Sequence, residues 1–383
     1  MVARLIRPIS LSQANVSDGL RAACASTAML LVGDYLHSSL FAWAAIGAFW
    51  TCLAKAAGSS ARRFLSMASF SLLSTIAGGA TAYAAGLGEH TAAVSIMVFV
   101  FAAGLSTIYS ASTYLVAILV ATACVVMVDH PLHGVTDGVS FLATYLTGCV
   151  FAMLLSFPVW RFRPSSSALS VHIEQAAVSK LPPNSPSTAE EDGVDVLPSS
   201  ASSWTRTAMR TVYTSLATMR VNMTMRSPGM RHAARLTVAT TGAFLVERAL
   251  RLPYGYWATM ATLLVMHPSI RTTLSRAIER SGGTTIGAAL AIAIGQFAHT
   301  SAAQSLAVFP LVCLTITLRK VNYGLFVIFL TPTFVLVANL ALPADEVGYA
   351  FARFGNNVIG ALLALIATYI LWPNRNADDL RAP

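Results

Sequence analysis

The residues best placed to do chemistry are charged side chains inside apolar stretches. Arg235 and Glu247 enclose eleven largely apolar residues, and Arg21 and Asp34 enclose twelve. Eleven residues of helix span only about 16 Å, whereas the hydrocarbon core of a bilayer is about 30 Å thick. Neither pair can place its two charges at opposite membrane interfaces. Some of these residues must therefore be buried in protein, face a water-filled vestibule, or snorkel to the surface.

Two interpretations of these four residues stay open. In the functional one, Arg21 and Arg235 bind a substrate carboxylate near the cytoplasmic mouth, because a guanidinium offers planar bidentate recognition. Asp34 and Glu247 would then couple transport to protons. In the structural one, the same residues snorkel and form ion pairs.

Aromatic residues and one further arginine lie near the other side of the membrane. Tyr256 and Trp257 begin an apolar segment, and Trp43 holds a comparable place earlier in the chain. They could form an interfacial aromatic belt or stack on an aromatic substrate. Arg353 lies about one turn into the last apolar segment, where it could face an exit path or pair with the acidic residues just before it.

The elements that carry these residues must be membrane helices. Of the 383 residues 55% are hydrophobic and 11% are charged, against about 25% charged in soluble domains. The apolar runs do not alternate with polar residues as barrel strands would. The sequence therefore predicts an all-α polytopic membrane protein.

Twelve spans are expected, in two sets of six. The first set is 20–37, 40–55, 65–87, 91–109, 113–128 and 139–160. The second set is 233–250, 254–268, 281–299, 302–318, 322–341 and 350–372. The run from Thr91 to Val128 is too long for one crossing and is divided into two.

The net charge of +9 is explained by membrane orientation rather than by a nucleic-acid partner. With the N-terminus in the cytoplasm, most basic loop residues fall inside: Arg4, Arg7, Lys55, Arg62, Arg63, Arg161, Arg163, Arg271, Arg276, Arg280, Arg319, Lys320 and Arg375. Few fall outside. The positive-inside rule thus predicts that both termini are cytoplasmic.

A polar segment separates the two sets of spans. Residues 181–203 are rich in Pro, Ser and acidic residues, which favours disorder. A basic amphipathic helix is expected to follow, either on the inner leaflet or packed against its neighbours. The predicted organisation is a first six-helix repeat at 1–160, a cytoplasmic linker at 161–230 and a second six-helix repeat at 231–383.

The two sets can be aligned on each other. Pairing Trp43 with Trp257 places Arg21 on Arg235 without a gap, and Gly148 pairs with Gly360 near the other end. Because six is even, both units would enter from the same side as parallel repeats, which commonly enclose a substrate path. The alternative is chance similarity between apolar helices.

The second half carries an ordered series of motifs. It runs through Arg235, Tyr256, Trp257, Pro268, Arg276, Arg280, Gly283, Thr284, Gly287, Arg353, Gly360 and Pro373. This series resembles the fusaric acid resistance family of bacterial inner-membrane proteins, which includes aromatic acid exporters and is similar to plant aluminium-activated malate transporters. The linker is much shorter than in many relatives.

The resemblance implies export of small, often aromatic, carboxylic acids across the inner membrane. Without a nucleotide-binding motif, the proton gradient or the substrate's own gradient would supply the energy. A passive organic-anion channel and a non-transporting envelope scaffold are the alternatives. A homo-oligomer and a periplasmic membrane-fusion protein are the protein partners considered. The sequence shows no enzyme motif, cofactor site or metal site, so we expect none.

Overall fold

The computed structural model describes residues 14–161, 217–341 and 346–371. Within these ranges every regular element is a helix. Most of the predicted linker, including its Pro/Ser-rich segment and nearly all of the predicted amphipathic helix, lies outside the described residues. Pro373 lies outside them too.

The first half (residues 14–161) contains six long helices. They are α1 (Val16–Tyr35), α2 (Phe41–Leu53), α3 (Ser60–Leu87), α4 (Glu89–Leu105), α5 (Ala111–Met127) and α6 (Val135–Arg161). The second half (residues 217–371) contains α9 (Pro228–Ala249), α10 (Tyr256–Val265), α11 (Ile270–Gly295), α12 (Ser301–Leu318), α13 (Tyr323–Ala341) and α14 (Glu346–Ile370). Every predicted span lies on one of these helices.

Capping residues explain where two helices begin. Ser110 accepts a hydrogen bond from the backbone N–H of Thr113 at 3.1 Å and so begins α5, which confirms the division of the long apolar run. Ser269 accepts one from the backbone N–H of Thr272 at 3.2 Å and begins α11. Helix α11 therefore begins eleven residues before the predicted span, which starts at 281. Its first three turns are polar, so hydropathy alone excluded them.

In the described part of the chain, six helical segments are long and apolar enough to cross a bilayer: Ser60–Leu87, Glu89–Ile108, Thr136–Phe157, Ser301–Leu318, Tyr323–Ala341 and Val347–Ile370. This confirms an all-α membrane protein. The apolar helices α2, α5 and α10 are shorter, at 10–17 residues. Twelve crossings therefore stay a prediction.

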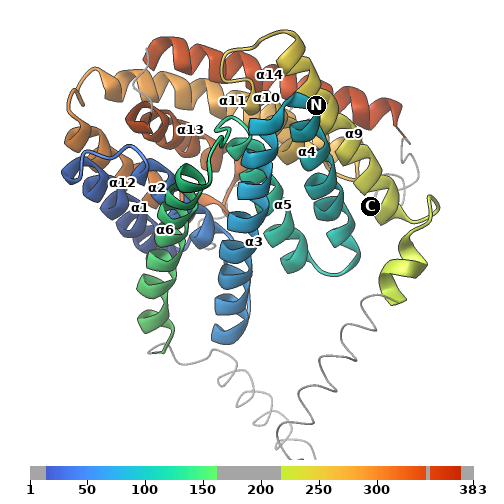
Figure 1. Cartoon of the computed structure of the whole chain (residues 1–383), viewed down its shortest axis with the longest axis horizontal. Coiled ribbons are helices and arrows are strands. Elements are labelled where there is room, and N and C mark those ends of the chain that lie inside the picture. Colours follow the sequence, from blue (N-terminus) through green and yellow to red (C-terminus); the bar gives the residue numbers. More distant parts are fainter. Residues whose placement is uncertain (1–13, 162–216, 342–345, 372–383) are drawn as a thin grey trace, which may run out of the picture.

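The first helix of each half packs against a helix of the other half. Helix α1 packs along α12 of the second half, and α9 packs along α4 of the first half. Within the halves, α2 packs on α6 as α10 packs on α14, and α3 packs on α5 as α11 packs on α13. In Figure 1 α3 and α6 run from top to bottom of the view, whereas α11 and α14 run across it. The cavity described below lies where α2, α5, α10 and α13 meet.

Glycines allow the closest of these contacts. A Cβ atom added at Gly148 of α6 would overlap the carbonyl oxygen of Ala44 in α2, and one added at Gly360 of α14 would overlap that of Ala258 in α10. Small residues let backbones approach in this way within membrane bundles. The α2–α6 pair of the first half and the α10–α14 pair of the second half are thus joined by the same kind of contact.

Replacing Gly148 with Ala should destabilise the protein by about 1–3 kcal/mol, because overpacking forces the helices apart. A Cβ atom added at Gly242 of α9 would meet no other atom within 4 Å. Gly242→Ala should therefore be neutral, or stabilising by about 0.5–1 kcal/mol through helix propensity. Thermal unfolding in detergent compares the two, and equal melting temperatures would contradict the packing argument.

Candidate functional site

A cavity of about 650 Å³ lies between the two halves. Its walls come mainly from α2, α5, α10 and α13 and are largely apolar. They include Phe49, Trp50, Leu53, Leu115, Ile118, Leu119, Met260, Leu264, Phe326, Leu330 and Phe334. A pocket of this size and character suits a small organic molecule.

Five of the described residues that line this cavity are basic. Lys55 follows the end of α2, Arg319 and Lys320 lie in the turn before α13, and Arg276 and Arg280 lie on the first half of α11. None of the described residues that line the cavity is acidic. The cavity therefore presents a net positive field to anions, although Asp18 just outside it offsets the charge of Lys55, and this field raises their local concentration.

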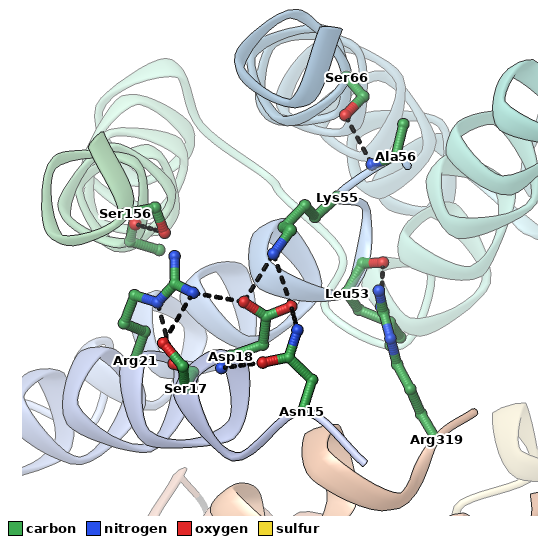
Figure 2. A network of polar contacts seen from close by, with 11 residues as sticks. Asn15, Ser17, Asp18, Arg21, Leu53, Lys55, Ala56, Ser66, Ser156 and Arg319 are labelled. Atoms are coloured by element: carbon green, nitrogen blue, oxygen red, sulfur yellow. Dashed lines mark hydrogen bonds and ion pairs between the residues drawn. The ribbon is translucent and has the colours of Figure 1, made fainter. Parts of the chain in front are cut away.

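Lys55 is held by a carboxylate just outside the cavity. Its Nζ atom lies 2.6 Å from Oδ1 and 2.5 Å from Oδ2 of Asp18, and the Arg21 guanidinium bonds the same carboxylate at 2.5 Å. Figure 2 shows Asp18 between the two cations. Burial lowers the pKa of Lys55 below its ordinary value, although Asp18 opposes this.

Arg319 and Arg276 are oriented by neutral groups. Arg319 donates a 2.6 Å hydrogen bond to the carbonyl oxygen of Leu53 (Figure 2), and burial lowers its pKa. The Arg276 guanidinium lies 4.7 Å from the centre of the Tyr323 ring. Neither side chain is paired with a carboxylate among the described residues, so both can take an external anion.

Aromatic rings narrow the deep end of the cavity. Phe334 lies edge-on to Phe49, with ring centres 5.6 Å apart, and edge-on to Trp257 at 5.9 Å. Trp50 lies 6.1 Å from the same ring. Phe334 thus lines the cavity, and its ring also packs on Trp257, which does not line it.

Beyond Phe334 lies a buried arginine. The Arg353 guanidinium is 3.6 Å from the centre of the Trp257 ring and 5.7 Å from that of Phe334, and the residue is only 3% exposed. Its Nε and Nη1 atoms have no hydrogen-bond partner in the described part of the chain. Cation–π contact supplies roughly 2 kcal/mol when desolvated, less than the several kcal/mol that burying an unpaired ion costs.

Arg280 connects the cavity to this buried arginine. It lines the cavity, and together with Arg353, Asn357 and Trp257 it also borders a gap between side chains that is too small to hold a water molecule. Its Nε atom donates to Asn357 Oδ1 at 2.7 Å, which leaves Asn357 Nδ2 without a partner among the described residues. Two arginines and one amide thus surround a space that holds no carboxylate within the described ranges.

Two tyrosine hydroxyl groups hold the side chain of Trp257, which lies on α10. Trp257 Nε1 donates to the Tyr349 hydroxyl at 3.1 Å, and the hydroxyls of Tyr256 and Tyr349 lie 2.8 Å apart. These bonds fix the indole face against Arg353. Of the aromatic residues singled out in the sequence, Trp257 lies beside the buried arginine and Tyr256 supports it.

Other residues predicted for substrate contact lie away from the cavity. Arg21 pairs with Asp18. Arg235 is buried, and its Nη1 atom lies 3.3 Å from the carbonyl oxygen of Pro268. Trp43 packs edge-on against Phe141, with ring centres 5.0 Å apart. None of the three lines the cavity.

The two carboxylates predicted for proton coupling differ in environment. Glu247 is 2% exposed and accepts a 2.8 Å hydrogen bond from Thr259. Its neighbour Arg248 pairs with Asp129 of the first half. Asp34 instead borders a separate 220 Å³ cavity near the end of α1. Glu247 therefore lies in the interior and Asp34 near the surface.

The glycine-rich part of the predicted family motif packs α11 on α13. A Cβ at Gly283 would lie 2.9 Å from the carbonyl oxygen of Gly324, and one at Gly287 would lie 2.6 Å from that of Ile328. Thr284 borders the gap beside Arg280. Close approach of these helices holds Arg280 against its neighbours.

Sequence reasoning did not assign Lys55, Arg319 or Lys320 to the site. All three were explained by membrane orientation, and their charge alone gave no other signal. Phe49 and Phe334 also went unnoticed within long apolar runs. Only the meeting of helices from both halves brings these residues to one cavity.

Part of the amino-acid sequence matches a family of known proteins. Residues 240–367 match the family model described as "Fusaric acid resistance protein-like". This segment belongs to that family. It contains α10, Arg280, Arg353 and Asn357, so the buried arginines lie within the fusaric acid resistance protein-like segment.

Curated relatives share this part of the chain. Protein YhfK of Escherichia coli K12 is 32% identical over 170 residues, which cover 43% of this chain and 24% of YhfK. The inner membrane proteins YccS and YeeA of the same organism are 27% and 30% identical over 153 and 149 residues, or 40% and 38% of this chain. Those matches cover 21% of YccS and 41% of YeeA.

The chain thus spans well under half the length of these relatives. No solved structure matches it. The apolar helices and the inner-membrane relatives together make it a multi-pass inner-membrane protein with a fusaric acid resistance protein-like segment.

Asp18→Asn should lower the free energy of unfolding by roughly 1–3 kcal/mol, because Lys55 and Arg21 would lose their shared carboxylate. Asp137 is exposed and has no ion pair among the described residues, so Asp137→Asn is a charge-matched control with an effect within about 0.5 kcal/mol. Thermal unfolding of both variants tests this, and indistinguishable melting temperatures would show that the network adds nothing.

Proposed function

We propose that this protein exports small organic carboxylates, aromatic acids among them, through the cavity between its halves. The observation that carries this proposal is the pair of buried arginines, Arg280 in the cavity wall and Arg353 behind it, with no carboxylate among the described residues that line the cavity or the gap beside Arg353. A buried charge costs several kcal/mol unless it is compensated. A transported carboxylate would supply that compensation at the moment it binds.

Binding would proceed in two steps. The cations around Lys320 and Arg319 concentrate anions at the wide end of the cavity. The apolar walls then hold the body of the molecule while Arg280 receives its carboxylate. Because a guanidinium binds a carboxylate through two parallel hydrogen bonds, it also fixes the orientation of the substrate.

Passage further along would require Phe334 to move. Its ring lies between the cavity and Arg353, so a change of rotamer would open a way between them. A path that opens and closes around a bound substrate is typical of carriers. A permanently open path would give a passive channel for organic anions.

The proposal includes a duplicated architecture with twelve crossings. The reciprocal packing of α1 on α12 and α9 on α4 supports two parallel repeats. So do the equivalent contacts of Gly148 with Ala44 and Gly360 with Ala258. Parallel repeats place a substrate path at their interface, which is where the cavity lies.

Proton coupling is assigned to Glu247. It is buried, it is held by Thr259, and it adjoins the Arg248–Asp129 pair that joins the halves. A change of its charge would alter the contact between the halves at that point. No homo-oligomer or membrane-fusion partner is needed for this mechanism.

Transport can be measured in inverted membrane vesicles with radiolabelled hydroxybenzoate. Arg280→Gln and Arg353→Gln should each reduce uptake by about tenfold or more, since removing one charged hydrogen bond costs roughly 1.5–3 kcal/mol. Arg62→Gln removes an exposed charge that does not line the cavity and should leave uptake unchanged. Normal uptake by both cavity variants would contradict the proposal. Ohmic currents in place of saturation would favour a channel, and no uptake of any acid would favour an envelope scaffold.

Glu247→Gln should flatten the dependence of uptake on an imposed proton gradient, because the amide cannot release a proton. Asp34→Asn should leave that dependence unchanged, since Asp34 lies near the surface. The measurement is initial uptake with and without the gradient in each variant. An unaltered dependence in Glu247→Gln would remove coupling from this residue.

A further inference from the structure

A second cavity, of about 220 Å³, lies at the other end of the helices that line the first one. Helix α2 lines the first cavity with Phe49 and Leu53 and the second with Ala42. Because Phe49 and Leu53 lie about two and three whole turns beyond Ala42, the three residues share one face of α2. Helix α13 lines the first cavity near its start, at Phe326, and the second near its end, at Leu340. The two cavities therefore lie at opposite ends of the contact between α2 and α13.

Helices α1 and α12 connect the same two regions. Lys55 of the first cavity is bound to Asp18 near the start of α1 (Figure 2), whereas Asp34 near the end of α1 lines the second cavity. Arg319 follows the last residue of α12 and lines the first cavity, and Ser301 begins α12 and lines the second. The length of α12 is about 27 Å, close to the thickness of the hydrocarbon core. The separation is thus enough to place the two cavities at opposite membrane surfaces.

The two cavities differ in charge. The first is lined by five basic residues and by no acidic one among the described residues. In the described wall of the second cavity Asp34 is the one carboxylate, and neither lysine nor arginine is present. His37 is the other ionisable residue there, and the remaining polar residues are serines: Ser38, Ser39, Ser301 and Ser305. Organic anions are therefore attracted at one end of these helices and repelled by Asp34 at the other.

Ser305 identifies the second cavity as a space for water or a polar ligand. The residue is 0% exposed, and its Oγ atom has no hydrogen-bond partner in the described part of the chain. Buried hydroxyl groups are nearly always hydrogen-bonded. The cavity is polar and large enough for several water molecules, so its contents can supply the missing partner. It is thus a hydrated space rather than a packing defect.

Apolar side chains close the contact between the two cavities. Phe49 and Phe334 meet edge-on in the wall of the first cavity, with ring centres 5.6 Å apart. Ala45 of α2 and Val337 of α13, each about one turn further along its helix, are buried. A way from one cavity to the other would therefore open when Phe334 moves, which is the movement that the proposed function already requires.

We infer that the second cavity is the release vestibule on the outer side of the membrane, and that Asp34 speeds release by repelling the acid. The inference rests on the proposed export function and on the cytoplasmic N-terminus predicted from the basic loops, which places the basic cavity inside. The carboxylate would leave Arg280, pass Phe334 and enter a polar space without lysine or arginine among its described lining residues. The same negative charge of Asp34 would oppose binding of the acid from outside.

Site-directed labelling tests the side on which each cavity opens. Ser301→Cys places a thiol in the second cavity, and Ser112→Cys places one in the first. A membrane-impermeant maleimide should label Ser301→Cys only in right-side-out vesicles and Ser112→Cys only in inverted vesicles. The unmodified protein, labelled in parallel, corrects for the five native cysteines. Labelling of both variants from the same side would overturn the inference.

The role of Asp34 is tested by the affinity for acid on each side. Asp34→Lys should lower the KM for entry of radiolabelled hydroxybenzoate into right-side-out vesicles by about threefold or more, because a cation would now attract the acid. The KM for export, measured in inverted vesicles, should stay within about twofold, since Asp34 does not line the first cavity and distant charges are screened by salt. A purely structural role of Asp34 would change both values together.

Asp137→Lys is the matched control for this charge reversal. Asp137 is exposed and does not line the second cavity, so its replacement should leave the KM for entry unchanged. Melting temperatures verify that both variants fold. An unchanged KM for entry in Asp34→Lys, or an equal fall in Asp137→Lys, would overturn the role of Asp34 while leaving organic-acid export intact.

Failure of the proposed function gives a different result. The unmodified protein would then transport no acid in either direction, which would count against export and with it the release role. The labelling experiment does not depend on transport and still shows where the second cavity opens. The two failures are therefore distinguishable.

Discussion

The arrangement of the site depends on one buried positive charge. Arg353 lies inside the helix bundle with an aromatic face, rather than a carboxylate, as its nearest described partner. Such a charge is costly in any low-dielectric setting, and ionisable residues inside membranes commonly serve function for that reason. Trp257, the tyrosine pair behind it and the Arg280–Asn357 bond are arranged around that guanidinium. Their combined geometry leaves hydrogen-bond donors for an anion.

The cavity lies between the two halves because the first helix of each half packs against the other half. Because α1 packs on α12 and α9 packs on α4, neither half closes on itself, and α2, α5, α10 and α13 meet between them. The basic residues reach the same end of the cavity because they lie where these helices begin or end. Apolar side chains from the first half, together with Lys55, then face four basic residues of the second half. Phe334 lines the cavity and lies 5.7 Å from the Arg353 guanidinium.

The sequence predicted the helices well because their apolar runs are long and their caps are distinct. It placed the start of the corresponding span at 281, because the first turns of α11 are polar and amphipathic. It singled out Arg353 and Trp257 as possible substrate contacts, whereas Arg280 was assigned only to the cytoplasmic side and to the family motif. It could not predict that Lys55, Arg319 and Lys320 share a cavity, since that depends on which helices pack together. Nor could it reveal that Arg21 is already paired with Asp18, because Asp18 precedes the first predicted span and its sequence position gave no sign of a partner.

The most direct test of the central claim is to locate a bound acid. Crystals of the protein grown with 4-bromobenzoate would give an anomalous signal from the bromine atom. The account predicts a peak inside the cavity near Phe49 and Trp50, with the carboxylate on the side of Arg280 and Arg353. A peak elsewhere, or a carboxylate directed away from Arg280 and Arg353, would contradict it.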